Sequence, residues 1–393
     1  MIDGKLQNNY KTMLILVIFI LNLCEWYDYS VYINLTANQE GEANAWLGFA
    51  IAYLAAPIGG LVSAMLADRF SYYYSMALSG IGMWHSSLLY YLFISCKPYI
   101  ISQGTISIEY IILFMIRIIH CFFVGGMMSL SFVELLKLKN FNKGILGSLP
   151  VLSMLTGITL GNKIYEMYNI EAILIYSATA LLCGIYLLLY SKLNFFAFCN
   201  YDNFIKESCK NIIDKTSKNI KPIVISCGIS SISAVSFFVL FLLLETHNAI
   251  QMNSFLIIIC IFCSLLGGYL CNAYNMFNFF YIITLLLSLI GMYNMNYISS
   301  GNISSAMMYL WFAIVFIYMG GEALIHNSLY NAKYINVAMV VSYNLGACIF
   351  GSTSPYFFSL SSNSTNNYFI TYFFIISILS LFAILCAEKF NSK

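Results

Sequence analysis

Residues 12–34, TMLILVIFILNLCEWYDYSVYIN, are apolar over a length that crosses a bilayer, yet they contain two carboxylates. An ionisable side chain at membrane depth costs at least a few kcal/mol, so such residues mark cavities, partner charges or transported ions. Glu25, Asp28 and Tyr32 stand at i, i+3 and i+7, which places them on one face of a helix. This pattern predicts that the acids line a cavity. The alternative is that they lie near the outer end of the helix and reach water.

The composition of the 393-residue chain is that of a polytopic membrane protein surrounded by a lipid bilayer. Hydrophobic residues make up 61% of it and charged residues 9%, whereas a soluble domain carries about a quarter charged residues. The formal net charge of +2 argues against nucleic acid as a partner. No loop holds a His/Asp/Glu cluster with metal spacing and no G-x-S-x-G occurs, so a membrane enzyme is disfavoured and no cofactor or metal is expected.

Polar, charged and Gly/Pro breaks divide the chain into stretches of about 20 apolar residues, the length of a membrane span. A lysine-rich loop, 192–221, separates six spans from six, so we expect an N-terminal six-helix bundle over 1–191 and a C-terminal one over 222–393. Such paired halves are common in secondary transporters. The twelve expected spans are 12–34, 45–67, 73–95, 108–131, 144–163, 170–191, 222–245, 253–272, 278–297, 305–328, 336–360 and 368–387.

Lysine and arginine positions support this count. With both termini in the cytoplasm, fifteen of the eighteen basic residues fall on the cytoplasmic side or in the central loop. Cytoplasmic loops are enriched in these residues, so the asymmetry predicts twelve helices with both ends inside. The excess of Ile, Asn, Tyr and Phe is typical of an AT-rich, for instance bacterial, genome, and we expect a multi-pass protein of the cell inner membrane.

Four stretches follow one another in an order and spacing that cover nearly the whole chain. They are residues 25–28 (EWYD), 54–60 (LAAPIGG) followed by 68–70 (DRF), 117–126 (RIIHCFFVGG) and 343–355 (YNLGACIFGSTSP). Together they resemble the motifs of the metabolite:proton symporters of the major facilitator superfamily. The resemblance implies alternating access between two six-helix bundles, and substrates such as proline, betaine, dicarboxylates, tricarboxylates or shikimate. It also implies that Asp68 and Arg69 act in gating.

The chain departs from the pattern of this family at several positions. Ala56 stands where the family has arginine, Met127 where it has glutamate, and His120 where it has glutamine. Ser71 replaces one of the basic residues expected after Asp68. These differences leave open an uncoupled facilitator or exchanger, or a degenerate paralogue, of the same fold.

Arg117 lies in the middle of its span and needs a partner. Its guanidinium suits a carboxylate, and Glu25 and Asp28 are the candidates; the alternative is a packing role against backbone carbonyls or another helix. His120 follows three residues later on the same face and serves either proton transfer or packing. Asp28 or Glu25 would bind the proton, and substrate binding that relieves the pair with Arg117 would couple the two transport events.

Aromatic and polar residues complete the expected substrate site. Trp26 and Tyr32 can stack on a quaternary ammonium or a zwitterion. Tyr343 and Asn344, a polar pair within a span, are expected in a structural or lining role. Two further ionisable residues, Glu322 and His326, stand at i and i+4 and either line the cavity or lie at a solvated helix end.

The sequence therefore predicts a secondary active transporter that moves a small metabolite with protons and works as a monomer. The substrate and proton site is expected at Glu25, Trp26, Asp28, Tyr32, Arg117, His120, Tyr343 and Asn344. The six-plus-six division disfavours a receptor or a channel.

Overall fold

The computed structural model describes residues 4–40, 42–95, 108–138, 141–192, 219–246, 254–299, 305–330, 335–362 and 368–392. Within these ranges every regular element is a helix. The central loop expected at 192–221 lies almost wholly outside the described residues.

The described helices form twelve passes, three of which are interrupted within their length. The continuous passes are α1 (Gly4–Glu40), α4 (Tyr72–Ser95), α7 (Lys143–Tyr168), α8 (Ala172–Lys192), α10 (Ile220–Thr246), α11 (Ser254–Ala273), α12 (Met276–Ser299), α13 (Ser305–Ser328) and α16 (Tyr368–Asn391). The interrupted passes are α2 (Glu42–Tyr53) with α3 (Ala55–Arg69), α5 (Ile108–Val124) with α6 (Met127–Leu136), and α14 (Ile335–Gly346) with η4 (Ala347–Ser352) and α15 (Ser354–Ser362). A short 3-10 turn, η2 (Asn169–Glu171), joins α7 to α8.

The expected all-α polytopic fold is confirmed, and each predicted span coincides with one pass. By length and hydropathy alone, ten stretches of the described residues qualify as spans. One of these, 143–191, contains both α7 and α8, and α4 is not among the ten. The buried face of α4 carries several serines, which lower its hydropathy, but it packs between α5 and α8 as a pass of the bundle.

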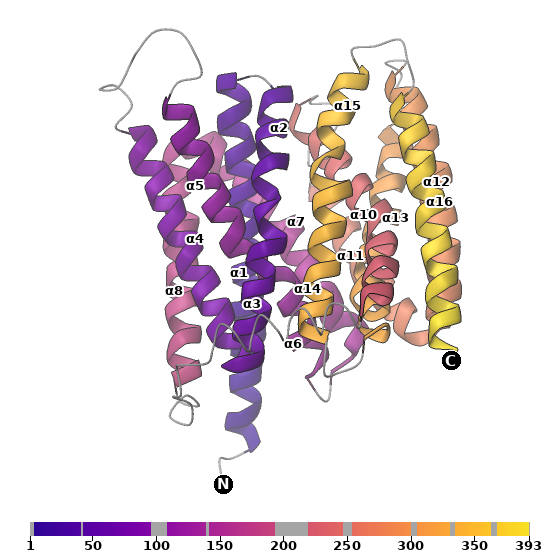
Figure 1. Ribbon diagram of the computed structural model, residues 1–393, viewed down its shortest axis with the longest axis horizontal. Coiled ribbons are helices and arrows are strands. Elements are labelled where there is room, and N and C mark those ends of the chain that lie inside the picture. The colour runs from indigo at the N-terminus through magenta and orange to yellow at the C-terminus, as the bar shows by residue number, and fades with distance from the viewer. Residues whose placement is uncertain are drawn as a thin grey trace.

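Two bundles lie side by side, with the N-terminal bundle (α1–α8) and the C-terminal bundle (α10–α16) occupying opposite sides in Figure 1. Within them, helices far apart in sequence pack together, α1 with α7 and α4 with α8, α10 with α16 and α11 with α13. Between them, α7 contacts α11 and α13, α3 contacts α14, and α2 contacts η4 and α15. Both chain termini lie at the same end of the molecule, which we call the termini end (Figure 1).

Glycine allows the bundles to touch at the termini end. A Cβ built on Gly144 of α7 would lie 1.9 Å from the carbonyl oxygen of Gly268 on α11, closer than real Cβ atoms come to any atom. Within the N-terminal bundle, a Cβ on Gly125 would lie 1.9 Å from the carbonyl oxygen of Ala56. Both positions therefore hold backbones in direct contact, as small residues do at helix crossings in membranes.

The helix interruptions lie beside the interface between the bundles. Pro57 falls in the first turn of α3, where its missing N–H has no helical partner to lose, and the helix restarts just after Tyr53. In the C-terminal bundle, α14 passes into the π-helical turn η4 at Ala347. Such turns leave the regular hydrogen-bond ladder and recur at functional sites. Tyr53 and Ala347 both line the cavity between the bundles.

Candidate functional site

Asp28 of α1 is the centre of a buried polar cluster in the N-terminal bundle. Arg117 of α5 donates from Nη1 to its Oδ2, and Tyr176 of α8 donates its hydroxyl to Oδ1. His120 lies one turn beyond Arg117, with Nε2 3.0 Å from Asp28 Oδ2. Asp28 is 5% exposed and Arg117 is 4% exposed. A buried carboxylate is thus balanced by a permanent positive charge and further hydrogen bonds, the arrangement that an interior ion pair needs.

The guanidinium of Arg117 rests on two aromatic rings of α1. Its central carbon lies 4.2 Å from the ring centroid of Tyr32 and 4.8 Å from that of Tyr29, both within cation–π range. Its Nε and Nη2 find no hydrogen-bond partner among the described residues. Arg117 is therefore anchored through Nη1 and stacking alone, which leaves two nitrogens, with three N–H donors, for a ligand or a water.

Two serines of α4 form hydrogen bonds with His120 and Tyr176 of this cluster. Ser86 Oγ lies 3.0 Å from His120 Nδ1, and Ser87 Oγ lies 2.6 Å from the hydroxyl oxygen of Tyr176. Because the Tyr176 hydroxyl proton goes to Asp28, the serine hydroxyl donates to Tyr176. The serines of α4 thus bind Tyr176 of α8 and His120 of α5, and these two residues contact the carboxylate on α1. A change in the charge of Asp28 would therefore alter contacts among four helices.

A small cavity opens beside this cluster. It encloses about 10 Å³, and Asp28, Tyr32, Arg117 and His120 line it together with Ser86, Ser87 and Tyr90. A space of this size holds about one water molecule. Asp28, Tyr32, Arg117 and His120, which were predicted to line a cavity, thus line this one.

Glu25 is also buried, at 2% exposed, but Arg117 pairs with Asp28 and not with it. Its Oε2 has no hydrogen-bond partner among the described residues. The alternative in which the two acids reach water at a helix end is wrong, since both side chains lie in the interior of the protein. Glu25 lies one turn before Asp28, beside Trp26, which faces a second cavity.

This second cavity lies between the bundles and encloses about 20 Å³. The N-terminal bundle contributes Trp26, Tyr53 and Met154 to its wall. The C-terminal bundle contributes Ser230, Ser233, Ala234, Phe237, Phe238, Met319, Glu322, Tyr343 and Ala347. Trp26 and Tyr343 were predicted in the site and line this cavity, one from each bundle. Interior space shared by two bundles is where a binding site can respond to their relative movement.

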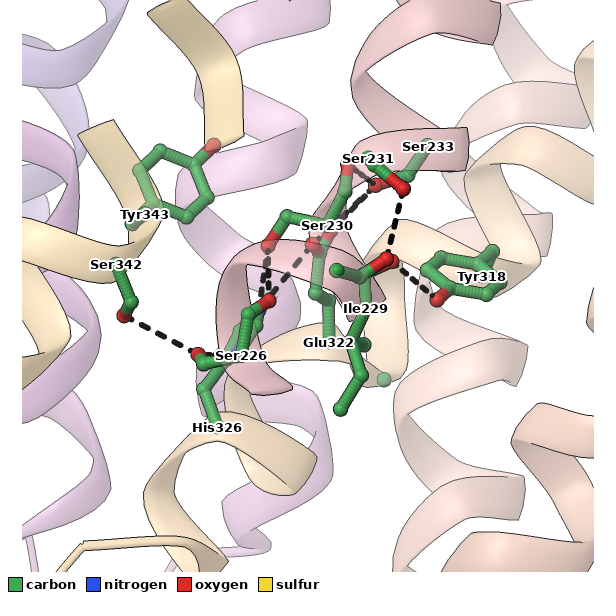
Figure 2. A network of polar contacts seen from close by, with 12 residues as sticks. Ser226, Ile229, Ser230, Ser231, Ser233, Tyr318, Glu322, His326, Ser342 and Tyr343 are labelled. Atoms are coloured by element: carbon green, nitrogen blue, oxygen red, sulfur yellow. Dashed lines mark hydrogen bonds and ion pairs between the residues drawn. The ribbon is translucent and has the colours of Figure 1, made fainter. Parts of the chain in front are cut away.

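Glu322 and His326 of α13 form a second polar cluster with serines of α10 (Figure 2). His326 Nε2 lies 3.2 Å from Glu322 Oε1 and 2.8 Å from Ser230 Oγ, and Nδ1 contacts Ser226. Ser233 lies 3.2 Å from both carboxylate oxygens. Glu322 is 3% and His326 0% exposed, so the expectation of a solvated helix end is wrong.

A serine pattern in α10 also indicates this cluster, although it was not among the predictions from the sequence. Ser226, Ser230 and Ser233 stand at i, i+4 and i+7 within an apolar span, so their hydroxyls share one helix face. A stripe of hydroxyls in a membrane span indicates a polar partner on a facing helix. Tyr176 had no comparable signal, because it is one of 31 tyrosines in the chain.

Tyr343 and Asn344 take separate roles in the structure. Tyr343 lines the cavity between the bundles and donates to Met128 Sδ across the interface, at 3.1 Å. Asn344 does not line it; its Nδ2 donates to the carbonyl oxygens of Gly125, at 2.5 Å, and Val340, at 2.8 Å. Asn344 therefore fastens α14 to the interruption between α5 and α6.

Asp68 and Arg69, the predicted gating pair, lie where α3 ends. Asp68 accepts a hydrogen bond from Asn336 Nδ2 on α14, and Tyr72 donates to the amide oxygen of the same asparagine. Lys137 in turn donates to the Tyr72 hydroxyl. The guanidinium of Arg69 lies 5.9 Å from the ring centroid of Phe70. Because passes alternate in direction, this network joins the two bundles at the termini end.

Comparison with solved structures places the whole chain in one architecture. The inward-open xylose transporter XylE from E. coli matches with a TM-score of 0.63 and 16% identity over 96% of each chain. The chain has the major facilitator fold. The proton:xylose symporter XylE bound to 6-bromo-6-deoxy-D-glucose matches with a TM-score of 0.61 and 14% identity, covering 98% of this chain and 96% of that one.

A human organic anion transporter, MFSD10 (TETRAN), has the same fold, with a TM-score of 0.59 and 13% identity over 94% of this chain and 98% of that chain. No family model and no curated protein matches the sequence. The similarity therefore shows the fold, and the narrower resemblance to proline, betaine and dicarboxylate symporters stays a prediction.

Proposed function

We propose that the protein is a secondary active transporter that moves a small metabolite together with protons by alternating access. The fold supports this function, and so does the likeness to XylE, which is named as a proton:xylose symporter. The observation that carries the proposal is the buried Asp28–Arg117 pair, with His120 3.0 Å from the same carboxylate oxygen. Buried ionisable residues are costly and mark proton or substrate paths in membrane proteins.

The Asp28 cluster can convert binding of a proton into movement. A proton on Asp28 removes the negative charge that holds Arg117 and the Tyr176 hydroxyl, so both hydrogen bonds weaken. His120 has a ring nitrogen beside the same oxygen and can deliver that proton from the small cavity. Asp28 and Trp26 share one turn of α1, so the protonation state at one cavity is transmitted to the wall of the other.

The cavity between the bundles is the proposed substrate site, with Trp26 and Tyr343 as lining residues. Its present volume admits about one water molecule, so a metabolite requires the bundles to move apart. The family resemblance suggests an osmolyte such as proline or betaine, or an organic acid. Glu25, buried on α1 next to Trp26, is proposed as a second proton-binding acid of the path.

The contacts at the termini end are the proposed inner gate. Asp68 meets Asn336 of the opposite bundle there, and Asn344 fastens α14 to Gly125 deeper in the interface. Release of these hydrogen bonds would let the bundles, proposed as 1–191 and 222–393 with a linker at 192–221, rock apart. Both termini are proposed to be cytoplasmic, in a monomer in the cell inner membrane.

Proteoliposomes with an imposed inward proton gradient test this function. The panel holds labelled proline, glycine betaine, 2-oxoglutarate, citrate, shikimate and choline. We expect uphill uptake of one of them, collapse of that uptake with a protonophore, and its loss with retained countertransport in Asp28→Asn. Glu134→Gln, a buried acid outside both cavities, is the control and keeps uphill uptake.

The outcomes separate the remaining alternatives. Countertransport without uphill uptake in the wild type would support the facilitator or exchanger. Uphill uptake that survives in Asp28→Asn would exclude Asp28 as the coupling residue. Consumption of a compound without its movement would indicate a membrane enzyme.

A further inference from the structure

Aromatic side chains of both bundles meet around the central cavity. The ring of Trp26 lies 5.3 Å from that of Phe237 and 6.0 Å from that of Phe238, measured between centroids. Tyr53 lies 6.4 Å from Phe238. Both bundles therefore contribute aromatic rings to the cavity wall. The face of such a ring attracts a positive charge, because the ring quadrupole is negative above and below the plane.

The wall of this cavity contains one acid. Among the described residues that line it, Glu322 is that acid, and none is a lysine or an arginine. Arg117, the buried arginine of the described residues, lines the other cavity and is held there by Asp28. A ligand in the central cavity therefore meets an acid and aromatic rings, with no lysine or arginine among the described residues of the wall.

The hydrogen bonds around His326 are complete when the ring is neutral. Ser226 Oγ can donate to Nδ1 of the histidine, so that Nε2–H is left to donate to Glu322 Oε1, 3.2 Å away, or to Ser230 Oγ, 2.8 Å away. One ring proton satisfies both nitrogens. Glu322 then accepts from the neutral histidine and from Ser233 (Figure 2), and no lysine or arginine of the described residues pairs with it.

Glu25 is a further buried acid near this cavity. It lies on α1 next to Trp26, a residue of the cavity wall. Its Oε2 has no hydrogen-bond partner among the described residues. The described interior as a whole holds four buried carboxylates, on Glu25, Asp28, Glu134 and Glu322, against one buried arginine.

We propose that the cavity between the bundles binds an organic cation, an amine or a quaternary ammonium. Glu322 balances its charge from one side, and the rings of Trp26, Phe237 and Phe238 enclose its apolar groups. This inference rests on the proposed function, because it supplies the substrate class of that transporter. A zwitterion such as glycine betaine fits less well, since its carboxylate would approach Glu322 with no cation in the described wall to receive it.

Direct binding to the purified, full-length protein in detergent tests the site without requiring transport. Isothermal titration with choline is compared with its uncharged isostere 3,3-dimethylbutan-1-ol, with glycine betaine, and with tetraethylammonium as a larger cation. We expect at least one cation to bind about tenfold more tightly than the isostere and glycine betaine. Glu322→Gln is expected to weaken that cation by about 10- to 100-fold while leaving the isostere unchanged.

Two further variants keep the result interpretable. Glu134→Gln removes a buried acid that accepts from Tyr73 and does not line the cavity, and it should bind the cation as the wild type does. Trp26→Leu keeps the acid but removes a ring, and it should reduce the preference for the cation over the isostere. A thermal melt of each variant checks that it is folded before binding is compared.

The outcomes distinguish this inference from the proposed function. The inference is overturned if neither cation binds more tightly than the isostere, or if Glu322→Gln binds the cation as tightly as the wild type. Cation binding without proton-driven uptake would keep the site and reject the coupling. Proton-driven uptake of a zwitterion or an anion, without cation binding, would keep the function and reject the substrate class.

Discussion

Each bundle buries a carboxylate beside a histidine, but the two carboxylates are balanced differently. In the N-terminal bundle, Asp28 is bound by the permanent charge of Arg117 and by the Tyr176 hydroxyl. In the C-terminal bundle, Glu322 accepts hydrogen bonds from Ser233 and from His326, whose own hydrogen bonds are complete when its ring is neutral. Asp28 therefore has a permanent counter-charge, whereas no lysine or arginine of the described residues pairs with Glu322. The difference favours proton coupling at Asp28 and substrate charge at Glu322.

The largest effect is expected from Arg117→Leu. Removing one partner of a buried ion pair leaves an uncompensated charge, which costs about 3–5 kcal/mol of the free energy of unfolding. SDS-titrated unfolding in mixed micelles measures this loss. The double variant Arg117→Leu/Asp28→Asn should recover much of it, because no buried charge is then left alone. Lys389→Ala, at an exposed position near the end of α16, is the control and should change stability by about 0.5 kcal/mol or less. Equal stability of the wild type and Arg117→Leu would show that Asp28 and Arg117 are not ionised together.

The two acid-to-amide substitutions should lower the free energy of unfolding by different amounts. Asp28→Asn leaves the buried guanidinium without its counter-charge, whereas Glu322→Gln leaves a neutral histidine and a serine that can still hydrogen-bond the new amide. We expect Asp28→Asn to lose about 2 kcal/mol more than Glu322→Gln in the same unfolding titration. Equal losses would mean that His326 is charged and pairs with Glu322 as Arg117 pairs with Asp28. His326→Gln, which removes that possible charge, would then be as destabilising as Arg117→Leu.

A smaller effect is expected at the ring beneath Arg117. Tyr32→Leu removes the closer of the two aromatic faces, 4.2 Å from the guanidinium carbon, and should cost about 1 kcal/mol. Tyr32→Phe keeps the face and should cost less. The same two substitutions are then made in the Arg117→Leu background, where Tyr32→Leu and Tyr32→Phe should have the same stability. If Leu and Phe still differ there, the ring acts through packing and not through the guanidinium.

The sequence predicted the twelve passes and most of the Asp28 cluster, because both follow from patterns along one helix. Span length and basic-residue asymmetry define the passes, and a lone arginine inside a span demands an acid. Whether Arg117 pairs with Asp28 or Glu25 depends on how α5 is shifted along its axis relative to α1, and residue spacing within one helix does not give that shift. The burial of Glu322 and His326 depended on the serine face of α10, more than 80 residues away in sequence. Contacts between helices are therefore the part of the site that patterns along a single helix cannot predict.

The smallest effect is expected at the interface of the bundles on the termini end. Asn336→Ala removes the hydrogen bonds to Asp68 and from Tyr72, which hold α14 against the N-terminal bundle. A net loss of about 1 kcal/mol would shift the closed-to-open ratio at this end about fivefold. Hydrogen–deuterium exchange should then be faster at the end of α3 and the start of α14. Asn391→Ala removes a hydrogen bond to Ser328 within the C-terminal bundle and is the matched control. Because only the first contact crosses between bundles, similar exchange in both variants would mean that Asn336 does not hold this end closed.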